Sequence, residues 1–323
     1  MVPHAYGAEC GDRPQATISV IIPTRNGAET LRELLAGLRL QGRQPDEIVV
    51  IDSASTDTTV QVAHEYGATV VPIPLAEFDH GGTRTLGATI ARGEFLVFFT
   101  QDALPAGRHL LARLVAPFDA DGAIGMSYGR QLPAFDADLL AAHLRQFNYP
   151  EQSAVRSFDD RTRYGLGTVF ASNSCAAYRR EVLAEVGYFP KGLIFGEDTW
   201  VAGKVLQRGK KIAYVAEAAV YHSHNYQPYE ELQRYFDIGV LHRSQSWLIE
   251  TYGSSTGRGL TYLRSGLRYV RQQGCSSAMG DFMVRVALKW IGYQLGRRYR
   301  ILPRSLAERL SLHKNWWVEL SGR

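Results

Sequence analysis

Acidic side chains directly after apolar runs are the residues of this sequence best placed to do chemistry. Residues 96–99 (LVFF) form a run long enough for a buried strand, and Thr100, Gln101 and Asp102 follow it. A carboxylate at the C-terminal end of such a strand lies at the edge where open parallel sheets bind ligands, whereas the simpler alternative is that Asp102 caps the next helix. Position in the sequence leaves both alternatives open.

A second acidic pair stands farther along the chain. Glu197 and Asp198 follow Gly196, where the chain can turn, and precede Trp200 and other apolar residues at helical spacing. Acids in a first helical turn often do no more than complement the helix dipole. A carboxylate in such a position can instead accept a proton as a general base.

Two histidines are further candidate ligands. His222 and His224 follow the apolar run at residues 216–221 and share one face if the chain stays extended. Imidazole nitrogens bind divalent metals, so either side chain could complete a coordination shell around a cation. The alternative is that both histidines hydrogen-bond a loop.

The elements that would carry these residues alternate between strands and helices. Apolar, β-branched runs predict strands, and leucines at helical spacing over residues 28–40 predict a helix between the first two. The predicted strands are Thr17–Pro23, Glu47–Ile51, Ala68–Pro72, Leu96–Phe99 and Ala123–Tyr128. Strand, helix, strand in this order predicts right-handed crossovers and therefore an α/β fold with a mostly parallel sheet flanked by helices.

Polar residues follow the first two strands at the edge where such sheets bind ligands. They are Pro23, Thr24, Arg25 and Asn26 after the first strand and Asp52, Ser53 and Asp57 after the second. Arg84 lies one turn into a later predicted helix, where its guanidinium could reach a diphosphate or could simply be solvated. Together these residues predict a nucleotide-binding sheet.

A polar segment within the apolar stretch 165–178 adds two candidate pocket residues. Asn173 and Ser174 could line the floor of a ligand pocket or belong to a bulged strand that satisfies its own backbone. Cys175 is expected to pack in the core, because no base is evident near it that would make it a nucleophile.

The composition limits the class of protein. The chain has 323 residues, and its three cysteines, Cys10, Cys175 and Cys275, are too far apart to predict a disulfide framework or a thiolate metal site. Residues 1–16 are expected to be a loose leader without an apolar signal segment, and no run of about 18 apolar residues occurs. We therefore expect a cytoplasmic protein, and one that could contact the inner face of the cell membrane peripherally.

The alternation of strands and helices stops after Pro228. Three long helices are predicted at Tyr229–Ile249, Leu260–Val270 and Phe282–Leu295. Eleven Arg or Lys stand against two acidic residues between positions 256 and 310, although the whole chain has a net charge of only +4. Basic residues interleaved with aromatics suit an anionic membrane surface, and no nucleic-acid-binding motif is present. The alternatives are a solvated helical appendage or a self-association surface that would make a homo-oligomer.

The order of these motifs closely resembles that of the family 2 glycosyltransferases, which have the GT-A fold. The resemblance covers about residues 17–225 and rests on PTRN (23–26), DSASTD (52–57), HGGTR (80–84), TQDA (100–103) and GEDTW (196–200). HGGTR, TQDA and YHSHNY (221–226) are similar to the bacterial rhamnosyltransferase branch. A GT-A domain over residues 17–225 is therefore expected, followed by a helical, basic C-terminal region over residues 226–323.

The resemblance also implies roles for individual residues. Asp198 would be the base that deprotonates the acceptor hydroxyl, and Asp102 would touch a divalent cation, Mg²⁺ or Mn²⁺, that stabilises the leaving diphosphate together with Arg84. The nucleotide-sugar donor would be bound by the residues after the first two strands and by Gln101. The acceptor or sugar pocket would include Asn173, Ser174, Glu197, Trp200 and Arg243.

The chain departs from the family's usual D-x-D metal motif, because Thr100 stands where the first aspartate would be. One carboxylate remains, so the expected cation site is weak and depends on diphosphate oxygens, water and either of His222 and His224. Direct attack by an acceptor hydroxyl would invert the anomeric centre and convert a β-linked donor to an α-L-rhamnoside.

The sequence thus predicts a metal-dependent inverting transferase that moves L-rhamnose from dTDP-β-L-rhamnose to a hydroxyl of a cell-surface polysaccharide or lipid-linked glycan. A UDP- or GDP-linked donor and a catalytically silent sugar-nucleotide-binding module are the alternatives. A dinucleotide-dependent oxidoreductase is disfavoured, because no G-x-G-x-x-G follows the first strand.

Overall fold

The computed structural model describes residues 16–254 and 257–319. All but the last residue of the predicted leader, including Cys10, lies outside the described residues. Within them no helix is long and apolar enough to cross a membrane.

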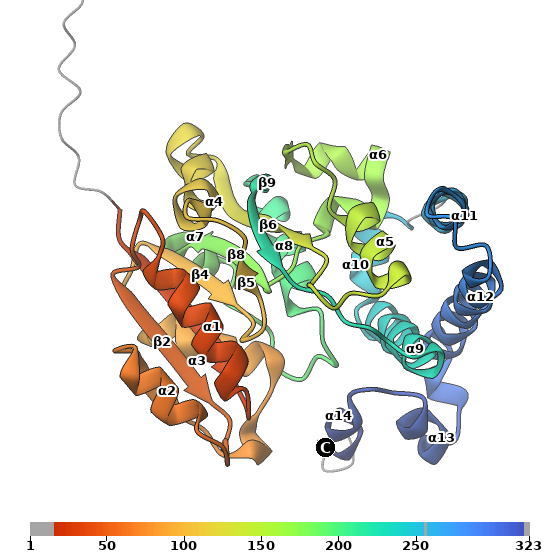
Figure 1. Ribbon diagram of the computed structural model, residues 1–323, viewed down its shortest axis with the longest axis horizontal. Coiled ribbons are helices and arrows are strands. Elements are labelled where there is room, and N and C mark those ends of the chain that lie inside the picture. Colours follow the sequence, from red (N-terminus) through yellow and green to blue (C-terminus); the bar gives the residue numbers. More distant parts are fainter. Residues whose placement is uncertain (1–15, 255–256, 320–323) are drawn as a thin grey trace, which may run out of the picture.

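A mixed, twisted sheet forms the centre of the described chain (Figure 1). Its strand order is β3-β2-β1-β4-β8-β6-β9-β5, and β7 pairs with β9. The strands are β1 (Ile18–Thr24), β2 (Glu47–Asp52), β3 (Thr69–Pro72), β4 (Phe95–Phe99), β5 (Leu104–Pro105), β6 (Ile124–Leu132), β7 (Ala154–Arg156), β8 (Cys175–Arg179) and β9 (Lys211–Tyr221).

The sheet combines the predicted parallel pairing with antiparallel pairs. Strand β1 pairs in parallel with β2 and β4, and β2 with β3, as the sequence predicts. Strand β8 is antiparallel to both β4 and β6, and β5 and β7 are antiparallel to β9. Strand β6, in contrast, is parallel to β9, so the sheet is mixed. The antiparallel strands could not be predicted, because side chains alternate in the same way in both kinds of pairing and strand direction leaves no local signal.

Helices cover both faces of the sheet, and alternate side chains of each strand enter the two resulting cores. In β1, Ile18, Val20 and Ile22 pack into one core, whereas Ile21 packs into the other. One core is closed by α1 (Ala28–Arg39), α2 (Thr59–Glu65) and α4 (Leu110–Ala120). The other is closed by α3 (His80–Ile90), α7 (Arg180–Glu185) and α8 (Glu197–Gln207).

Between β6 and β8 the chain forms α5 (Leu139–Asn148) and α6 (Arg161–Tyr164). Short 3₁₀ turns occur at Leu75–Glu77, Phe158–Asp160, Gly165–Val169 and Tyr299–Ile301.

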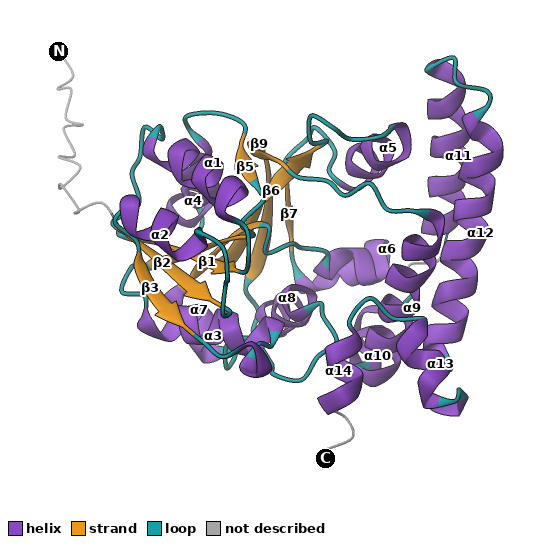
Figure 2. Ribbon diagram, turned by 60° about the horizontal axis from the view of Figure 1, so that its bottom comes forward, coloured by secondary structure: helices purple, strands orange, loops and turns teal. Residues whose placement is uncertain are grey.

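The C-terminal helices lie at the side of the sheet away from β3 (Figure 2). They are α9 (Pro228–Ser244), α10 (Ser246–Tyr252), α11 (Arg258–Gln272), α12 (Ala278–Arg297), α13 (Arg304–Arg309) and α14 (Lys314–Glu319). The single helix predicted at Tyr229–Ile249 is wrong, because the helix breaks at Gln245. Beyond the break Trp247 packs against Trp200 and Lys204 of α8, a tertiary contact that the helical periodicity does not reveal.

Candidate active site

The loops after β1, β2 and β4 are tied together by hydrogen bonds at one edge of the sheet. The Arg25 N–H donates to Gln101 Oε1 (2.9 Å), and Gln101 Nε2 donates to the Arg25 carbonyl (3.2 Å). The Asn26 N–H donates to Ser55 Oγ (2.9 Å), while Asn26 Oδ1 accepts from the Thr56 N–H (2.8 Å). The structure thus brings together the residues that the sequence assigns to the donor.

Asp52 is buried at the base of this edge. Its Oδ1 accepts from Thr24 Oγ1 (3.2 Å), and its Oδ2 accepts from the Ser55 N–H (2.9 Å). Asp57 accepts from the Ala28 N–H (3.2 Å), so it anchors the start of α1. These bonds hold the loops in place before any ligand arrives.

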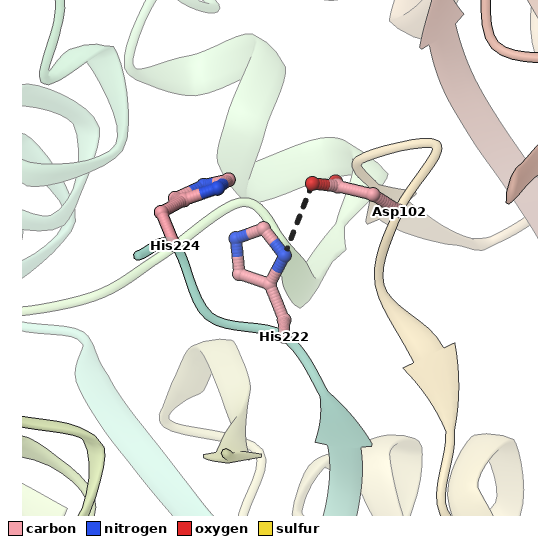
Figure 3. A group of neighbouring side chains, drawn as sticks. All are labelled: Asp102, His222 and His224. Carbon is pink, nitrogen blue, oxygen red and sulfur yellow. Dashed lines mark ion pairs between the residues drawn. The ribbon is translucent and has the colours of Figure 1, made fainter. Parts of the chain in front are cut away.

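Asp102, His222 and His224 converge beside this edge (Figure 3). Strand β5 returns antiparallel to β9 and pairs Leu104 with Tyr221, which places Asp102 next to the segment after β9. His222 Nδ1 lies 3.5 Å from Asp102 Oδ2, and one ligand atom from each of the three residues lies within 4.8 Å of the others. Asp102 does not cap α4, which has no side-chain cap bond.

The two imidazoles are electrically neutral in this environment. Burial lowers the pKa of His222 to about 4, although Asp102 works against that shift. Burial lowers the pKa of His224 as well. The buried Nδ1 of His222 has no hydrogen-bond partner among the described residues, so its lone pair is available to a cation. One carboxylate and two neutral imidazoles are a donor set that fits a divalent metal.

The acidic pair at the start of α8 has two different environments. Glu197 is 5% exposed, and its Oε1 lies 3.2 Å from Arg84 Nη1 and accepts from Asn173 Nδ2 (3.1 Å). Burial alone would raise the pKa of Glu197, but Arg84 and His80 outweigh it and hold the pKa below its usual value. Glu197 is therefore an anion.

Asp198 is partly exposed and is oriented by backbone groups. Its Oδ2 accepts from the Asn173 N–H (3.2 Å), and its Oδ1 accepts from the Thr199 N–H (2.7 Å). Burial and then the neighbouring Glu197 charge raise the pKa of Asp198 from 3.8 to about 6. A carboxyl with such a pKa is ionised at neutral pH and still basic enough to accept a proton efficiently.

A short chain of polar contacts joins the acidic pair to the histidine cluster. Ser172, just before Asn173, accepts from Gln131 Nε2 of β6 (3.0 Å), and Gln131 Oε1 accepts from Arg145 Nη1 of α5 (2.5 Å). The His222 N–H donates to the carbonyl of the residue after Gln131 (3.0 Å). The two candidate centres therefore lie at the same end of β6 and β9.

The other predicted site residues are placed as follows. Ser174 is buried beside Asn173, and the hydroxyl of Tyr178 donates to Asn173 Oδ1 (2.7 Å). This segment both contacts the acidic pair through Asn173 and closes a turn of its own, in which the Cys175 N–H donates to the Ser172 carbonyl (3.3 Å). Trp200 packs edge-on against Trp247. Arg243 is exposed and makes no hydrogen bond or ion pair with another described residue.

Comparison with known proteins identifies the family. A family model described as glycosyl transferase family 2 matches residues 19–187 of the chain, which include the loops after β1, β2 and β4. The protein belongs to glycosyl transferase family 2.

Two relatives of this glycosyltransferase are similar over nearly the whole chain. The O-antigen chain rhamnosyltransferase WbaN of Salmonella anatum is 38% identical over 93% of this chain and 96% of its own length. The O-antigen chain rhamnosyltransferase RfbN of Salmonella typhimurium is 40% identical, with the same coverage of both chains.

Solved structures show that the fold of the glycosyltransferase is GT-A. The mannosyltransferase PcManGT from Pyrobaculum calidifontis, in complex with GDP-Man and Mn²⁺, superposes with a TM-score of 0.58 at 18% identity and covers 94% of this chain and 86% of its own. TarS 1–349 of S. aureus in complex with UDP-GlcNAc has a TM-score of 0.53 at 19% identity, covering 88% and 91%.

Sequence reasoning about the glycosyltransferase missed the partners that set the charge of its acidic pair. Arg84 is 6% exposed and faces Glu197, so it is not the solvated side chain that was the alternative from the sequence. Gln131, Arg145 and Tyr178 also escaped notice. A polar residue at the end of a predicted strand was the only signal for Gln131, and Tyr178 has the pattern of an ordinary core residue.

Proposed function

We propose that this glycosyltransferase moves L-rhamnose from dTDP-β-L-rhamnose to a hydroxyl of an O-antigen-type polysaccharide or lipid-linked glycan, with inversion at the anomeric carbon. The observation that supports this most is the similarity to two O-antigen chain rhamnosyltransferases, which extends over 93% of the chain. This similarity extends over the C-terminal helices, which lie beyond the region that the family model matches. We propose that these helices select the acceptor.

Asp198 is the proposed catalytic base. It would take the proton of the acceptor hydroxyl while that oxygen attacks the anomeric carbon and the bond from that carbon to the diphosphate oxygen breaks. The backbone N–H groups of Asn173 and Thr199 fix the carboxylate, so its free lone pairs point in a defined direction. General base catalysis of this kind contributes roughly 10²- to 10⁴-fold.

Glu197 and Arg84 are proposed to support this base, while the contact of Arg84 with the leaving diphosphate and the place of Glu197 in the acceptor or sugar pocket stay proposals. The buried Glu197 anion keeps the pKa of Asp198 raised, and Arg84 neutralises Glu197. Trp200, Ser174 and Arg243 remain proposed acceptor or sugar contacts.

The loops after β1, β2 and β4 are proposed to bind the nucleoside diphosphate. Asp52 and the turn at Thr24–Asn26 would bind the base and ribose, with Pro23, Ser53, Asp57 and Gln101 shaping the same edge. A Cβ on Gly27 would lie 2.2 Å from Gln101 Nε2, so the two loops are packed as closely as the backbone permits.

Asp102, His222 and His224 are proposed to hold a divalent cation. When bound, it would neutralise charge on the departing diphosphate. Thr100 stands where the family's first aspartate would be, and the two neutral imidazoles would take the place of that missing carboxylate. A donor set of one oxygen and two nitrogens suits Mn²⁺ better than Mg²⁺, which prefers oxygen ligands alone.

A direct assay tests the reaction. The purified protein is incubated with Mn²⁺, a glycan acceptor and dTDP-, UDP- or GDP-linked sugars, and nucleotide release and the anomeric configuration of the product are measured. We expect dTDP release that EDTA abolishes and an α-linked product. Turnover with UDP- or GDP-sugars alone would overturn the rhamnose assignment, and donor binding without turnover on any acceptor would favour the silent binding module.

Two matched variants test the base. Asp198→Asn should lower kcat by roughly 10²- to 10⁴-fold with unchanged dTDP affinity in calorimetry. Asp159→Asn changes a carboxylate whose side chain is 97% exposed and should leave both quantities unchanged. Full activity of the Asp198 variant would exclude it as the base.

Two further predictions also stay proposals. One is the domain boundary between residues 225 and 226, and the other is self-association into a homo-oligomer. Contact of the basic C-terminal region with an anionic membrane is a proposal as well, and the arrangement of α11 and α12 gives it a defined surface.

A further inference from the structure

Helix α12 has charged side chains inside and apolar side chains outside. Arg285 and Lys289 are only 9% and 7% exposed, whereas Trp290 and Val284 are 66% and 54% exposed. A helix on the surface of a globular protein normally shows the reverse arrangement. Exposing apolar side chains to water in this way costs free energy. A contiguous exposed apolar surface of this kind marks a site that contacts an apolar partner.

The inner face of α12 is fixed against α9 by two kinds of contact. Arg285 Nη1 and Lys289 Nζ each lie 3.4 Å from a carboxylate oxygen of the buried Glu231. A Cβ on Gly292 or Gly296 would lie 2.3 Å or 2.0 Å from a backbone oxygen of α9, so the helices touch backbone to backbone. Rotating α12 to bury its apolar face would break both contacts.

The outer face of α12 is an uncharged stripe. Its members recur at helical spacing on the side opposite Arg285 and Lys289. They are Met283, Val284, Ala287, Trp290 and Ile291. Eight positions separate the first and last of these residues, which is about 12 Å along the helix.

Helix α11 packs beside α12 and carries positive charge on its own exposed side. Arg264, Arg268 and Arg271 are exposed at helical spacing, so they share its outer side. The two helices pack together where the Phe282 ring fills the space over Gly266. Figures 1 and 2 both show α11 and α12 side by side at the edge of the molecule.

We propose that this outer face of α11 and α12 binds an anionic lipid surface. The stripe on α12 enters the boundary between headgroups and acyl chains, and the three arginines of α11 pair with headgroup phosphates. A second copy of the chain fits less well, because a self-complementary contact would bring the arginine rows of both copies to one interface. The proposal rests on the proposed function only where it explains how a lipid-linked acceptor reaches the site.

Vesicle flotation tests the proposal with the full chain. Vesicles of phosphatidylglycerol and phosphatidylethanolamine are compared with phosphatidylcholine alone, at low and high salt. We expect binding to the anionic vesicles that salt weakens. Replacing Arg264, Arg268 and Arg271 by Gln should lower the partition constant on the order of 100-fold, since each basic residue contributes about fivefold.

A matched pair of charge insertions tests the apolar stripe. Trp290→Glu should lower the partition constant at least about tenfold. Leu40→Glu changes a side chain that is 60% exposed at the end of α1 and should have no effect on vesicle binding. Both variants should keep the wild-type melting temperature.

Two outcomes would overturn the proposal. One is that wild type and Trp290→Glu bind anionic vesicles equally weakly, with the same partition constant. The other is a wild-type dimer in sedimentation that Trp290→Glu converts to a monomer, because the stripe would then cover a second copy. The dTDP affinity is measured on the same samples without vesicles, so failure of the lipid proposal is distinguished from failure of the donor assignment.

Discussion

The raised pKa of Asp198 predicts how the reaction depends on pH. Burial and the Glu197 anion raise this pKa from 3.8 to about 6, so ionised Asp198 falls from about nine-tenths at pH 7 to about one-tenth at pH 5. The base must be ionised to accept a proton, and kcat/KM should therefore fall roughly tenfold between these pH values. An ordinary aspartate would stay almost fully ionised over the same range.

Removing the negative charge of Glu197 should shift the low-pH fall of kcat/KM to lower pH. In Glu197→Gln the like charge is gone and Arg84 stays nearby, so the pKa of Asp198 should fall on the order of one unit. At pH 5 the variant should then keep about half of its own plateau rate, roughly five times the fraction kept by wild type.

The assay is dTDP release at an acceptor concentration well below KM, which reports kcat/KM, from pH 4.5 to 8.5, with the melting temperature recorded at each pH. Glu181→Gln removes an exposed acid from the first turn of α7 and should leave the profile unchanged. Two results would refute the reasoning. One is a wild-type kcat/KM whose low-pH fall has its midpoint below pH 5, and the other is a midpoint that Glu197→Gln leaves unchanged.

Three further substitutions have defined outcomes. Asp102→Ala should abolish the Mn²⁺-dependent part of donor binding in calorimetry, whereas retained Mn²⁺ dependence would place the cation elsewhere. Gly27→Ala should weaken dTDP binding more than it lowers the melting temperature, because its Cβ would displace Gln101 at 2.2 Å; unchanged affinity would show that the displaced loop is not used. Gly296→Ala should destabilise the protein by about 2 kcal/mol or more in urea unfolding, because its Cβ would lie 2.0 Å from the Phe236 carbonyl oxygen; an unchanged midpoint would show that α9 and α12 can separate freely.

Much of the first half of the fold could be predicted from local patterns. The near-continuous apolar runs of β1, β2 and β4 predict strands buried on both faces, and these strands do pair in parallel. The direction of β8 could not be predicted in this way. Its sequence, CAAYR, fits a buried strand of either direction, and the antiparallel pairing depends on how the chain returns through α5 and α6.

The residues of the candidate site could be predicted individually but not their partners. The spacing of His222 and His224 indicated a shared face, but only the return of β5 along β9 brings Asp102 to them. Likewise, the place of Arg84 in its helix predicted a diphosphate contact, but only the fold shows that Arg84 lies against Glu197.

What the sequence alone determined is the kind of chemistry and the order in which its elements occur, because residue type and local spacing are written along one chain. What only the tertiary structure decided is which groups share a charge environment: the raised pKa of Asp198 beside Glu197, the neutral imidazole of His222 near Asp102, and the outward apolar face of α12. Charge interaction and burial depend on distance through space, and the chain's return across the sheet sets that distance.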